Sequence, residues 1–432
     1  MSDIIAAIAT GRAPCAIGIL RLSGPGCAAL TGRVFTPKQP FEDAPDRRLV
    51  LGLLHDRQGR VIDECLGVVC RAPHSYTGEE TVELQCHGSP AMLAAGLESL
   101  LAAGARQAGP GEFTRRAFLN GKLDLTQAEA VVDLIDAETA DAAANAAGQL
   151  GGALKRAIRP VYDGLTDLCS HFHAVLDYPD EDIEDFGAAE LSGALDRADT
   201  ALQELLATYE KGRHLRQGVR AVLLGKPNAG KSSLLNRLAG YDRVIVTDIA
   251  GTTRDTVEEP VRVGRVLLRL TDTAGIREAG DAIEALGVAR SEQAAREAEL
   301  ALFVCDASQP LTDEDRRAIE AAKCAPRSLA LCNKSDLPAA ISPDELPFDT
   351  VLTVSARTGA GLDALPAVLE GWFLGENACD GSLLTNPRQF GALDRASRAI
   401  KRAKTGLGLG VTPDAVLTDV EEAMAALGEV TG

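Results

Sequence analysis

The sequence predicts a multi-domain protein of mixed α/β and α class, in which a P-loop nucleotide domain is inserted into a helical domain that follows an N-terminal α/β domain. Three observations predict this fold class. At 432 residues the chain is longer than one hydrophobic core usually serves, which suggests about three domains. Its apolar pattern changes along the chain from mixed strand and helix to helix alone. A glycine-rich loop between an apolar strand and a helix then interrupts the helical pattern.

The N-terminal domain is expected over residues 1–119. Apolar strands are predicted at 16–22, 66–70 and 81–86, and an alanine- and leucine-rich helix at 90–103. Strands and helices mixed in this way indicate an α/β domain.

The helical pattern extends over residues 126–216, with breaks expected at Pro160 and at 178–180 because proline cannot donate a helical hydrogen bond. The pattern resumes over 387–427. The helical domain is therefore expected in two parts, 120–215 and 379–432, with the nucleotide domain between them at 216–378.

The phosphate loop is the strongest motif in the chain. The apolar run 219–224 leads into 225–232, Gly-Lys-Pro-Asn-Ala-Gly-Lys-Ser, and a helical leucine pattern follows. Lys231 would supply charge to the outer phosphates, and the Ser232 hydroxyl is placed to bind Mg²⁺. A glycine turn that happens to precede Lys-Ser is the alternative, and the flanking strand and helix argue against it.

The choice of nucleotide depends on a second strand end, where Asn333-Lys334-Ser335-Asp336 follows an apolar run. A carboxylate at Asp336 can accept from both the ring N–H and the exocyclic amine of guanine, whereas adenine offers no such pair of donors. Asn333 and Lys334 would hold the loop and cover the base. Ser355-Ala356, after the predicted strand 351–354, would supply a backbone donor to the guanine carbonyl.

Two loops between these motifs are expected to sense hydrolysis. The strand 267–270 leads to Asp272, placed near the metal, and Gly275, placed near the γ-phosphate. The polar loop 247–255 would close over the nucleotide, with Thr253 as a second Mg²⁺ ligand. The candidate GTP-binding residues are Asn228, Ala229, Gly230, Lys231, Ser232, Ser233, Thr247, Asp248, Ile249, Ala250, Gly251, Thr252, Thr253, Asp272, Thr273, Ala274, Gly275, Asn333, Lys334, Asp336, Ser355 and Ala356.

Together these motifs resemble the MnmE (TrmE) family of bacterial tRNA-modification GTPases, in the TrmE-Era-EngA-like class. The resemblance extends to both flanks of the nucleotide domain, through segments 18–24, 76–80, 83–88, 109–114, 117–125 and 177–181. It implies a Ras-like G domain with a mostly parallel sheet and helices on both faces, and an N-terminal domain of folate-binding type.

The resemblance also implies how hydrolysis proceeds without the glutamine that Ras-like GTPases carry after the glycine of Asp-x-x-Gly, since Ile276 stands there. In the family, two G domains meet and K⁺ binds beside the phosphates. The matching K⁺ ligands here are Asn228, Thr247, Ile249 and Thr252. The matching water-orienting residue is Glu284, which acts with Gly275 and Thr253 in the catalytic set. From spacing alone, Glu284 would be taken for a solvated helix position.

For the N-terminal domain the resemblance implies a homodimer and binding of 5-formyl- or 5,10-methylene-tetrahydrofolate at Arg21, Glu83 and Lys122. It further implies a heterotetramer with the FAD-dependent protein MnmG. The two proteins together would install an aminomethyl or carboxymethylaminomethyl group at C5 of wobble uridine 34 in certain tRNAs. Family members carry a C-terminal Cys-x-Gly-Lys tail, and the printed sequence reaches Gly432 without it. We expect either a shortened sequence or a different capacity for tRNA modification, with GTP hydrolysis independent of the tail.

Composition limits where and how the chain acts. The net charge of −18 is unfavourable for binding tRNA, so the partner is expected to carry much of that binding. The densest basic group, 395–404, would be a helix surface balanced by the acidic stretch 414–422. The ten cysteines lack Cys-x-x-Cys spacing and are expected to be buried free thiols. Since the sequence shows neither a membrane span nor a leader pattern, a cytoplasmic location without membrane attachment is expected.

Two other functions share the nucleotide motifs. A GTP-switched assembly factor for ribosomes or other RNA would use them without base chemistry, and direct rRNA binding without folate would favour it. If the protein were an ATPase, Asp336 would play no part in recognising the base. A comparison of GTP and ATP binding decides between the two nucleotides.

Overall fold

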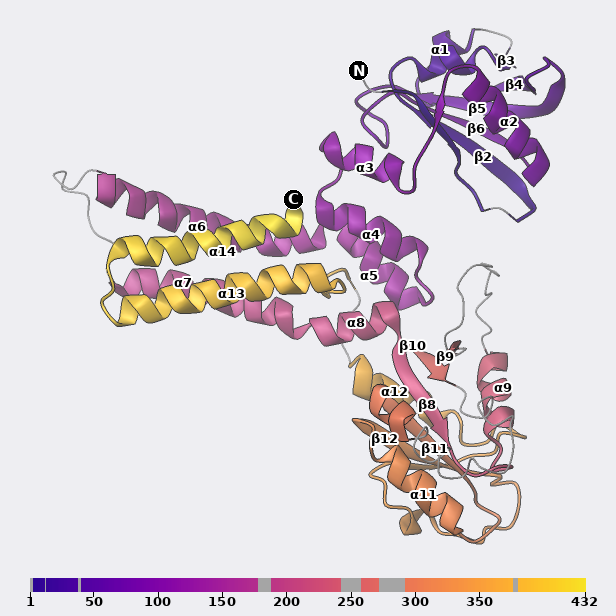
Figure 1. Ribbon diagram of the computed structural model, residues 1–432, viewed down its shortest axis with the longest axis vertical. Coiled ribbons are helices and arrows are strands. Elements are labelled where there is room, and N and C mark those ends of the chain that lie inside the picture. The colour runs from indigo at the N-terminus through magenta and orange to yellow at the C-terminus, as the bar shows by residue number, and fades with distance from the viewer. Residues whose placement is uncertain are drawn as a thin grey trace. The chain divides into compact units, whose positions relative to one another are not determined.

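The computed structural model describes residues 3–11, 13–37, 40–177, 188–241, 258–271, 292–375 and 380–432 (Figure 1). The chain divides into two compact units, each considered by itself below. The first unit comprises residues 1–131 with 431–432, and the second comprises 132–430. Among the described residues, none of the helices has the length and apolar character needed to cross a membrane.

The first unit contains a seven-stranded sheet in the order β3-β4-β5-β6-β2-β1-β7, antiparallel except for the pair β1 and β7. The strands are β1 (Ile5–Ile8), β2 (Cys15–Ser23), β3 (Phe35–Pro37), β4 (Val50–His55), β5 (Val61–Cys70), β6 (Thr81–Gly88) and β7 (Arg106–Gln107). The helices are α1 (Cys27–Thr31), η1 (Phe41–Asp43), α2 (Pro90–Ala102), α3 (Glu112–Leu119) and α4 (Leu125–Ile135), the last crossing the boundary between the units.

One face of this sheet forms the core of the first unit. Leu20, Leu22 and Leu84 are fully buried there and cluster with Leu93 and Leu100 of α2, as period-two alternation along the strands requires. The predicted strands 16–22 and 81–86 and the helix 90–103 are confirmed to within two residues, whereas the strand predicted at 66–70 extends back to 61.

The helical part of the second unit is a bundle of α6, α7, α13 and α14, which share one apolar core (Figure 1). Its helices are α5 (Ala140–Leu150), α6 (Ala153–Asp177), α7 (Ala188–Ala207), α8 (Tyr209–Gln217), α13 (Pro387–Gly408) and α14 (Pro413–Thr431).

The break predicted at Pro160 is wrong, because α6 continues through it. Leu154, Ile158, Leu165 and Phe172 on this helix are buried in the bundle core, and Pro160 itself is exposed. Burying four large apolar side chains outweighs the ~3 kcal/mol that an interior proline costs. The break predicted at 178–180 lies outside the described residues.

The nucleotide part has a six-stranded sheet in the order β13-β12-β11-β8-β10-β9, parallel except for β9, which is antiparallel to β10. The strands are β8 (Val219–Leu224), β9 (Glu258–Val263), β10 (Val266–Thr271), β11 (Leu300–Asp306), β12 (Arg327–Asn333) and β13 (Val351–Thr353). The helices are α9 (Lys231–Tyr241), α11 (Asp313–Ala322), η3 (Pro343–Glu345) and α12 (Ala364–Phe373).

Helices cover both faces of this sheet. Ala221 and Leu223 of β8 belong to a core shared with α9 and α12, while Val222 and Leu224 belong to a second core shared with α11. A strand buried on both faces is expected to be continuously apolar, as β8 is from 221 to 224. The predicted fold class is confirmed.

Candidate functional site

The phosphate loop follows β8 and has a backbone that only particular residues tolerate. Gly225 and Gly230 have φ values of 145° and 97°. A Cβ at Gly230 would lie 2.1 Å from Asn333 Nδ2, and one at Gly225 would lie 2.1 Å from the Val304 carbonyl oxygen. Glycine is therefore required at both positions by close approach as well as by conformation.

Lys231 extends back across this loop. Its ammonium donates to the carbonyl oxygens of Gly225 at 2.7 Å and Lys226 at 2.8 Å. Helix α9 begins at Lys231, so Ser232 and Ser233 stand in its first turn, where backbone N–H groups and the helix dipole favour anions. The loop, the ammonium and the helix start together form a cradle for phosphate.

Asn333 joins the phosphate loop to the predicted base site. Its buried amide donates to the Ala229 carbonyl at 2.9 Å and accepts from the Ala356 N–H at 2.9 Å. Lys334 has a left-handed φ of 66° and donates to Asp306 Oδ2 at 2.6 Å. The Asn333 contacts join the phosphate loop to two loops that follow it by more than 100 residues in sequence.

Asp336 lies beside the loop after β13. The Ser355 hydroxyl donates to Asp336 Oδ1 at 2.7 Å, and this hydrogen bond lowers the pKa of the carboxyl group. An ionised Asp336 is an acceptor for the paired N–H donors of guanine. The Ala356 N–H, predicted to be available to the guanine carbonyl, donates to Asn333 in this structure, so that assignment stays a prediction.

Several candidate residues lie outside the described residues: Thr247, Asp248, Ile249, Ala250, Gly251, Thr252, Thr253, Asp272, Thr273, Ala274, Gly275 and Glu284. The described residues next to these segments show where the segments join the fold. β9 begins after the first of these segments, and β10 ends immediately before Asp272, so both segments are connected to one β-hairpin.

A buried ion pair that the sequence does not predict joins the phosphate loop to α11. Lys226 Nζ lies 2.8 Å from Asp315 Oδ2, and the Asp315 side chain is only 1% exposed. Asp315 also accepts from the backbone N–H and hydroxyl of Thr312, forming the capping box of α11. The Thr-x-x-Asp spacing predicts such a cap. The pairing with Lys226, 89 residues away, depends on tertiary structure.

In the first unit, the structure brings Arg21 and Glu83 together on neighbouring strands. They are register partners of β2 and β6, with Arg21 Nε donating to Glu83 Oε1 at 2.7 Å. The Arg21 guanidinium lies 5.7 Å from the ring centre of Tyr76 and 5.8 Å from that of Phe113. Lys122 donates to the Pro73 carbonyl at 3.1 Å, in the same connection that carries Tyr76.

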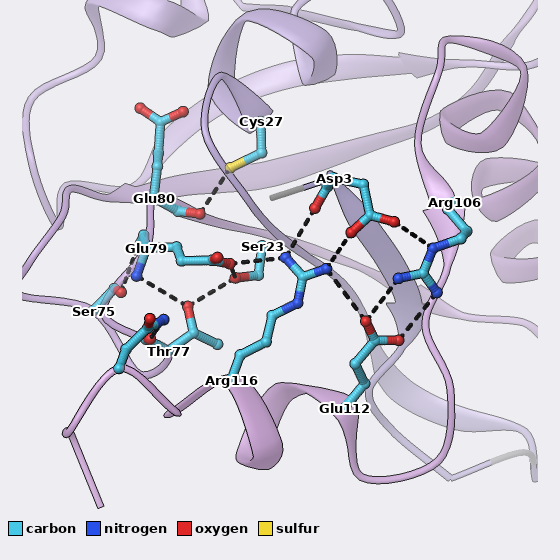
Figure 2. A network of polar contacts seen from close by, with 11 residues as sticks. Asp3, Ser23, Cys27, Ser75, Thr77, Glu79, Glu80, Arg106, Glu112 and Arg116 are labelled. Carbon is cyan, nitrogen blue, oxygen red and sulfur yellow. Dashed lines mark hydrogen bonds and ion pairs between the residues drawn. The ribbon is translucent and has the colours of Figure 1, made fainter. Parts of the chain in front are cut away.

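A network of ion pairs holds the segments that carry these aromatic rings (Figure 2). Arg116 of α3 is buried and donates to Glu79 at 2.9 Å, to the Asp3 carboxylate at 2.6 Å and to Glu112 at 3.2 Å. Arg106 binds the same Asp3 and Glu112, at 2.5 and 2.7 Å. Hydrogen bonding to Arg106 lowers the pKa of both carboxyl groups to about 2. The network thus fixes α3, with Phe113, against the loop that carries Tyr76.

The fold and the site define a P-loop GTP-binding protein. The family described as GTP-binding protein TrmE N-terminus matches residues 4–122, and the MnmE helical domain matches residues 125–432. The tRNA modification GTPase MnmE of Roseiflexus sp. (strain RS-1) is 45% identical over 446 residues, spanning 100% of this chain and 95% of that protein. The protein of the same name from Aquifex aeolicus is 41% identical over 436 residues, spanning 100% and 96%. The chain belongs to the MnmE (TrmE) family.

Among solved structures, the G domain of the T. maritima FeoB iron transporter matches at 22% identity with a TM-score of 0.26, over 34% of this chain and 94% of that chain.

Proposed function

We propose that this chain is a K⁺-stimulated GTPase that hydrolyses GTP with Mg²⁺ and acts in tRNA modification. Together with an FAD-dependent MnmG-type partner, it would install an aminomethyl or carboxymethylaminomethyl group at C5 of wobble uridine 34 in certain tRNAs. The observation that carries the proposal is the arrangement around Asn333, which ties the phosphate loop to the guanine-selective Asp336 region. The names of the relatives support the tRNA substrate. Ser232 and Thr253 would hold Mg²⁺, and the cytoplasm, where tRNA is used, is the expected location.

The role proposed for K⁺ draws support from Asn228. This residue is exposed at the tip of the phosphate loop and has a left-handed φ of 63°. An exposed amide there can supply an oxygen ligand to an alkali cation, together with Thr247, Ile249 and Thr252, and can meet a second G domain. The cation would offset transition-state charge, and Glu284 would orient water.

The test replaces Na⁺ by K⁺ at constant ionic strength and measures GTP turnover. We expect turnover to rise strongly in K⁺, and the rise to be lost in Asn228→Ala. Equal turnover in the two salts would reject the K⁺ mechanism while leaving the GTPase intact. ATP binding as tight as GTP binding would reject the guanine site itself.

The homodimer proposed through the N-terminal domain is supported by exposed apolar side chains on the seven-stranded sheet. Ile17, Leu51, Leu53 and Val61 are exposed on strands of this sheet. A second copy of the chain would remove these apolar side chains from water. Light scattering of the whole chain should give a dimer mass, and Leu51→Glu with Leu53→Glu should give a monomer.

Folate is the proposed ligand of Arg21, Glu83 and Lys122. The carboxylate can bind the amine and ring N–H of a pterin, and the cations suit the glutamate tail of folate. Binding of 5-formyl-tetrahydrofolate that is lost in Arg21→Ala or Lys122→Ala supports a modification enzyme. Direct rRNA binding without folate would favour an assembly factor instead. The domain limits 119/120, 215/216 and 378/379 stay predictions that limited proteolysis can test.

A further inference from the structure

One end of the sheet in the first unit holds a cluster of metal-ligating side chains that the proposed function does not use. Asp63 and Cys65 on β5 and Cys86 on β6 place a carboxylate oxygen and two sulfur atoms within 4.8 Å of one another. Leu66 faces Gln85 in the antiparallel pairing of these two strands, and the same register puts Cys65 opposite Cys86. The two thiols are therefore cross-strand neighbours on the inner face of the sheet.

The carboxylate makes this cluster unlike a pair of inert core thiols. The Asp63 side chain is only 7% exposed, and both of its oxygens are oriented by His87. The His87 backbone N–H donates to Oδ2 at 2.8 Å, and ring Nδ1 lies 2.7 Å from Oδ1. Carboxylate ligands of metals are commonly held by outer hydrogen bonds of this kind.

A third strand carries another thiol near this end of the sheet. Cys15 of β2 is the register partner of Gly88, two residues beyond Cys86. A Cβ at Gly88 would lie 2.4 Å from Cys15 Sγ, so this thiol occupies the space that a side chain at Gly88 would fill. Cys15 is exposed, whereas Cys65 and Cys86 are buried.

We propose that Asp63, Cys65 and Cys86 form a binding site for a thiophilic divalent cation such as Zn²⁺, with Cys15 as the fourth ligand. Thiolates select Zn²⁺ over Mg²⁺ and Ca²⁺, and three sulfur ligands with one oxygen suit its tetrahedral preference. Zn–S bonds of about 2.3 Å and Zn–O bonds of about 2.0–2.2 Å set ligand atoms about 3.5–3.8 Å apart. The three atoms within 4.8 Å therefore need to move by about 1 Å or less.

The proposal is tested by titrating Co²⁺ into the reduced, metal-free full chain. We expect a sulfur-to-cobalt charge-transfer band that saturates at one ion per chain and disappears when Zn²⁺ is added. Cys65→Ser and Cys86→Ser should each lose the band. Cys70→Ser, farther along β5 and outside the cluster, is the matched control and should keep it. Cys15→Ser should keep a weaker band; an unchanged band would remove Cys15 from the site.

Zinc-edge X-ray absorption of the unsubstituted protein makes the test independent of how the variants fold. The expected coordination shell of the zinc ion contains sulfur at about 2.3 Å and oxygen at about 2.0–2.2 Å from the metal. A shell of nitrogen and oxygen alone, or a cobalt band that survives in both Cys65→Ser and Cys86→Ser, would overturn the site. GTP binding is a useful internal control, because the G domain is remote in sequence from these ligands and should bind GTP equally with and without the ion.

Discussion

At the scale of single residues, Asp336 should decide which nucleotide binds. Asp336→Asn replaces one acceptor oxygen with an amide donor, so the paired N–H donors of guanine lose an acceptor. We expect GTP affinity to fall on the order of 10- to 100-fold, the equivalent of about 1.5–3 kcal/mol for a hydrogen bond to a charged group. Xanthosine triphosphate, which carries a carbonyl in place of the guanine amine, should bind the variant better than GTP does.

Competition binding with both nucleotides measures this change. Ser355→Ala is the control, since it removes only the hydroxyl that orients Asp336 and should lower GTP affinity without favouring xanthine. A variant Asp336→Asn that keeps its preference for GTP would exclude Asp336 from the base site.

Gly230 should be intolerant of any side chain. Gly230→Ala adds a methyl group 2.1 Å from Asn333 Nδ2 at a φ of 97°. The bond from Asn333 to the Ala229 carbonyl must then break or shift. We expect a destabilisation of about 1–3 kcal/mol and a loss of GTP affinity, measured by thermal unfolding and nucleotide titration. The control is Gly240→Ala on α9. Leaving aside the backbone of its own helix and its chain neighbours, no described atom lies within 4 Å of the added Cβ, so this change should be neutral or slightly stabilising.

At the scale of elements, the Lys226–Asp315 pair connects the phosphate loop to α11. Asp315→Ala leaves a lysine that is only 14% exposed without its carboxylate and removes the cap of α11. We expect the free energy of unfolding to fall by about 3–5 kcal/mol. Asp313→Ala, two residues earlier and 95% exposed, should change it by less than about 0.5 kcal/mol. Denaturant titrations of both variants measure their losses of unfolding free energy. Equal losses would show that the Lys226–Asp315 pair contributes little.

The elements of the G domain were predictable because their signals are local. The run 219–224 became β8 at its predicted limits, and the helix predicted after the phosphate loop begins at Lys231. The helix through Pro160 was predicted wrongly because the core that stabilises α6 comes partly from α13 and α14, more than 200 residues later. The bridge made by Asn333 and the pair Lys226–Asp315 depend in the same way on strand order, which no local pattern contains.

At the scale of the whole molecule, acid should destabilise the first unit by protonating two of its ion-paired carboxylates. The pKa values of Asp3 and Glu112 are lowered to about 2 from ordinary values of 3.8 and 4.5. Groups with a depressed folded pKa stabilise the fold above their unfolded pKa and lose that effect as pH falls through the folded value. Both residues belong to the first unit, so its stability should decline between about pH 4.5 and 2.

Calorimetry of the whole chain across this range tests the acid response. Glu112→Gln should lower the melting temperature of one transition at pH 7 and flatten its decline below pH 4.5. Glu98→Gln, an exposed carboxylate on α2 of the same unit, is the matched control and should alter neither. Identical pH profiles for the two variants would contradict the role given to the Arg106 network.

The charge of the whole chain should also determine how tRNA is bound. With a net charge of −18, the chain needs clustered free cations to attract phosphates. Its densest basic group, on α13, is already paired with carboxylates. The pairs are Arg395 with Glu429, Arg398 with Asp394, Lys401 with Asp199, Arg402 with Asp419 and Glu422, and Lys404 with Asp196. Arg402 pairs with carboxylates of the acidic stretch 414–422, as predicted. The other four cations pair with carboxylates outside that stretch.

Because tRNA phosphates would have to displace these carboxylates, we expect the chain alone to bind tRNA weakly. The logarithm of the binding constant should fall only gently with the logarithm of salt concentration, since each phosphate neutralised adds about 0.7–0.9 to the slope. Arg402→Ala should leave tRNA affinity unchanged within about twofold, and addition of the proposed FAD-dependent partner should raise both the affinity and the slope. A steep slope for the chain alone that Arg402→Ala reduces by about one unit would instead place the tRNA contact on α13.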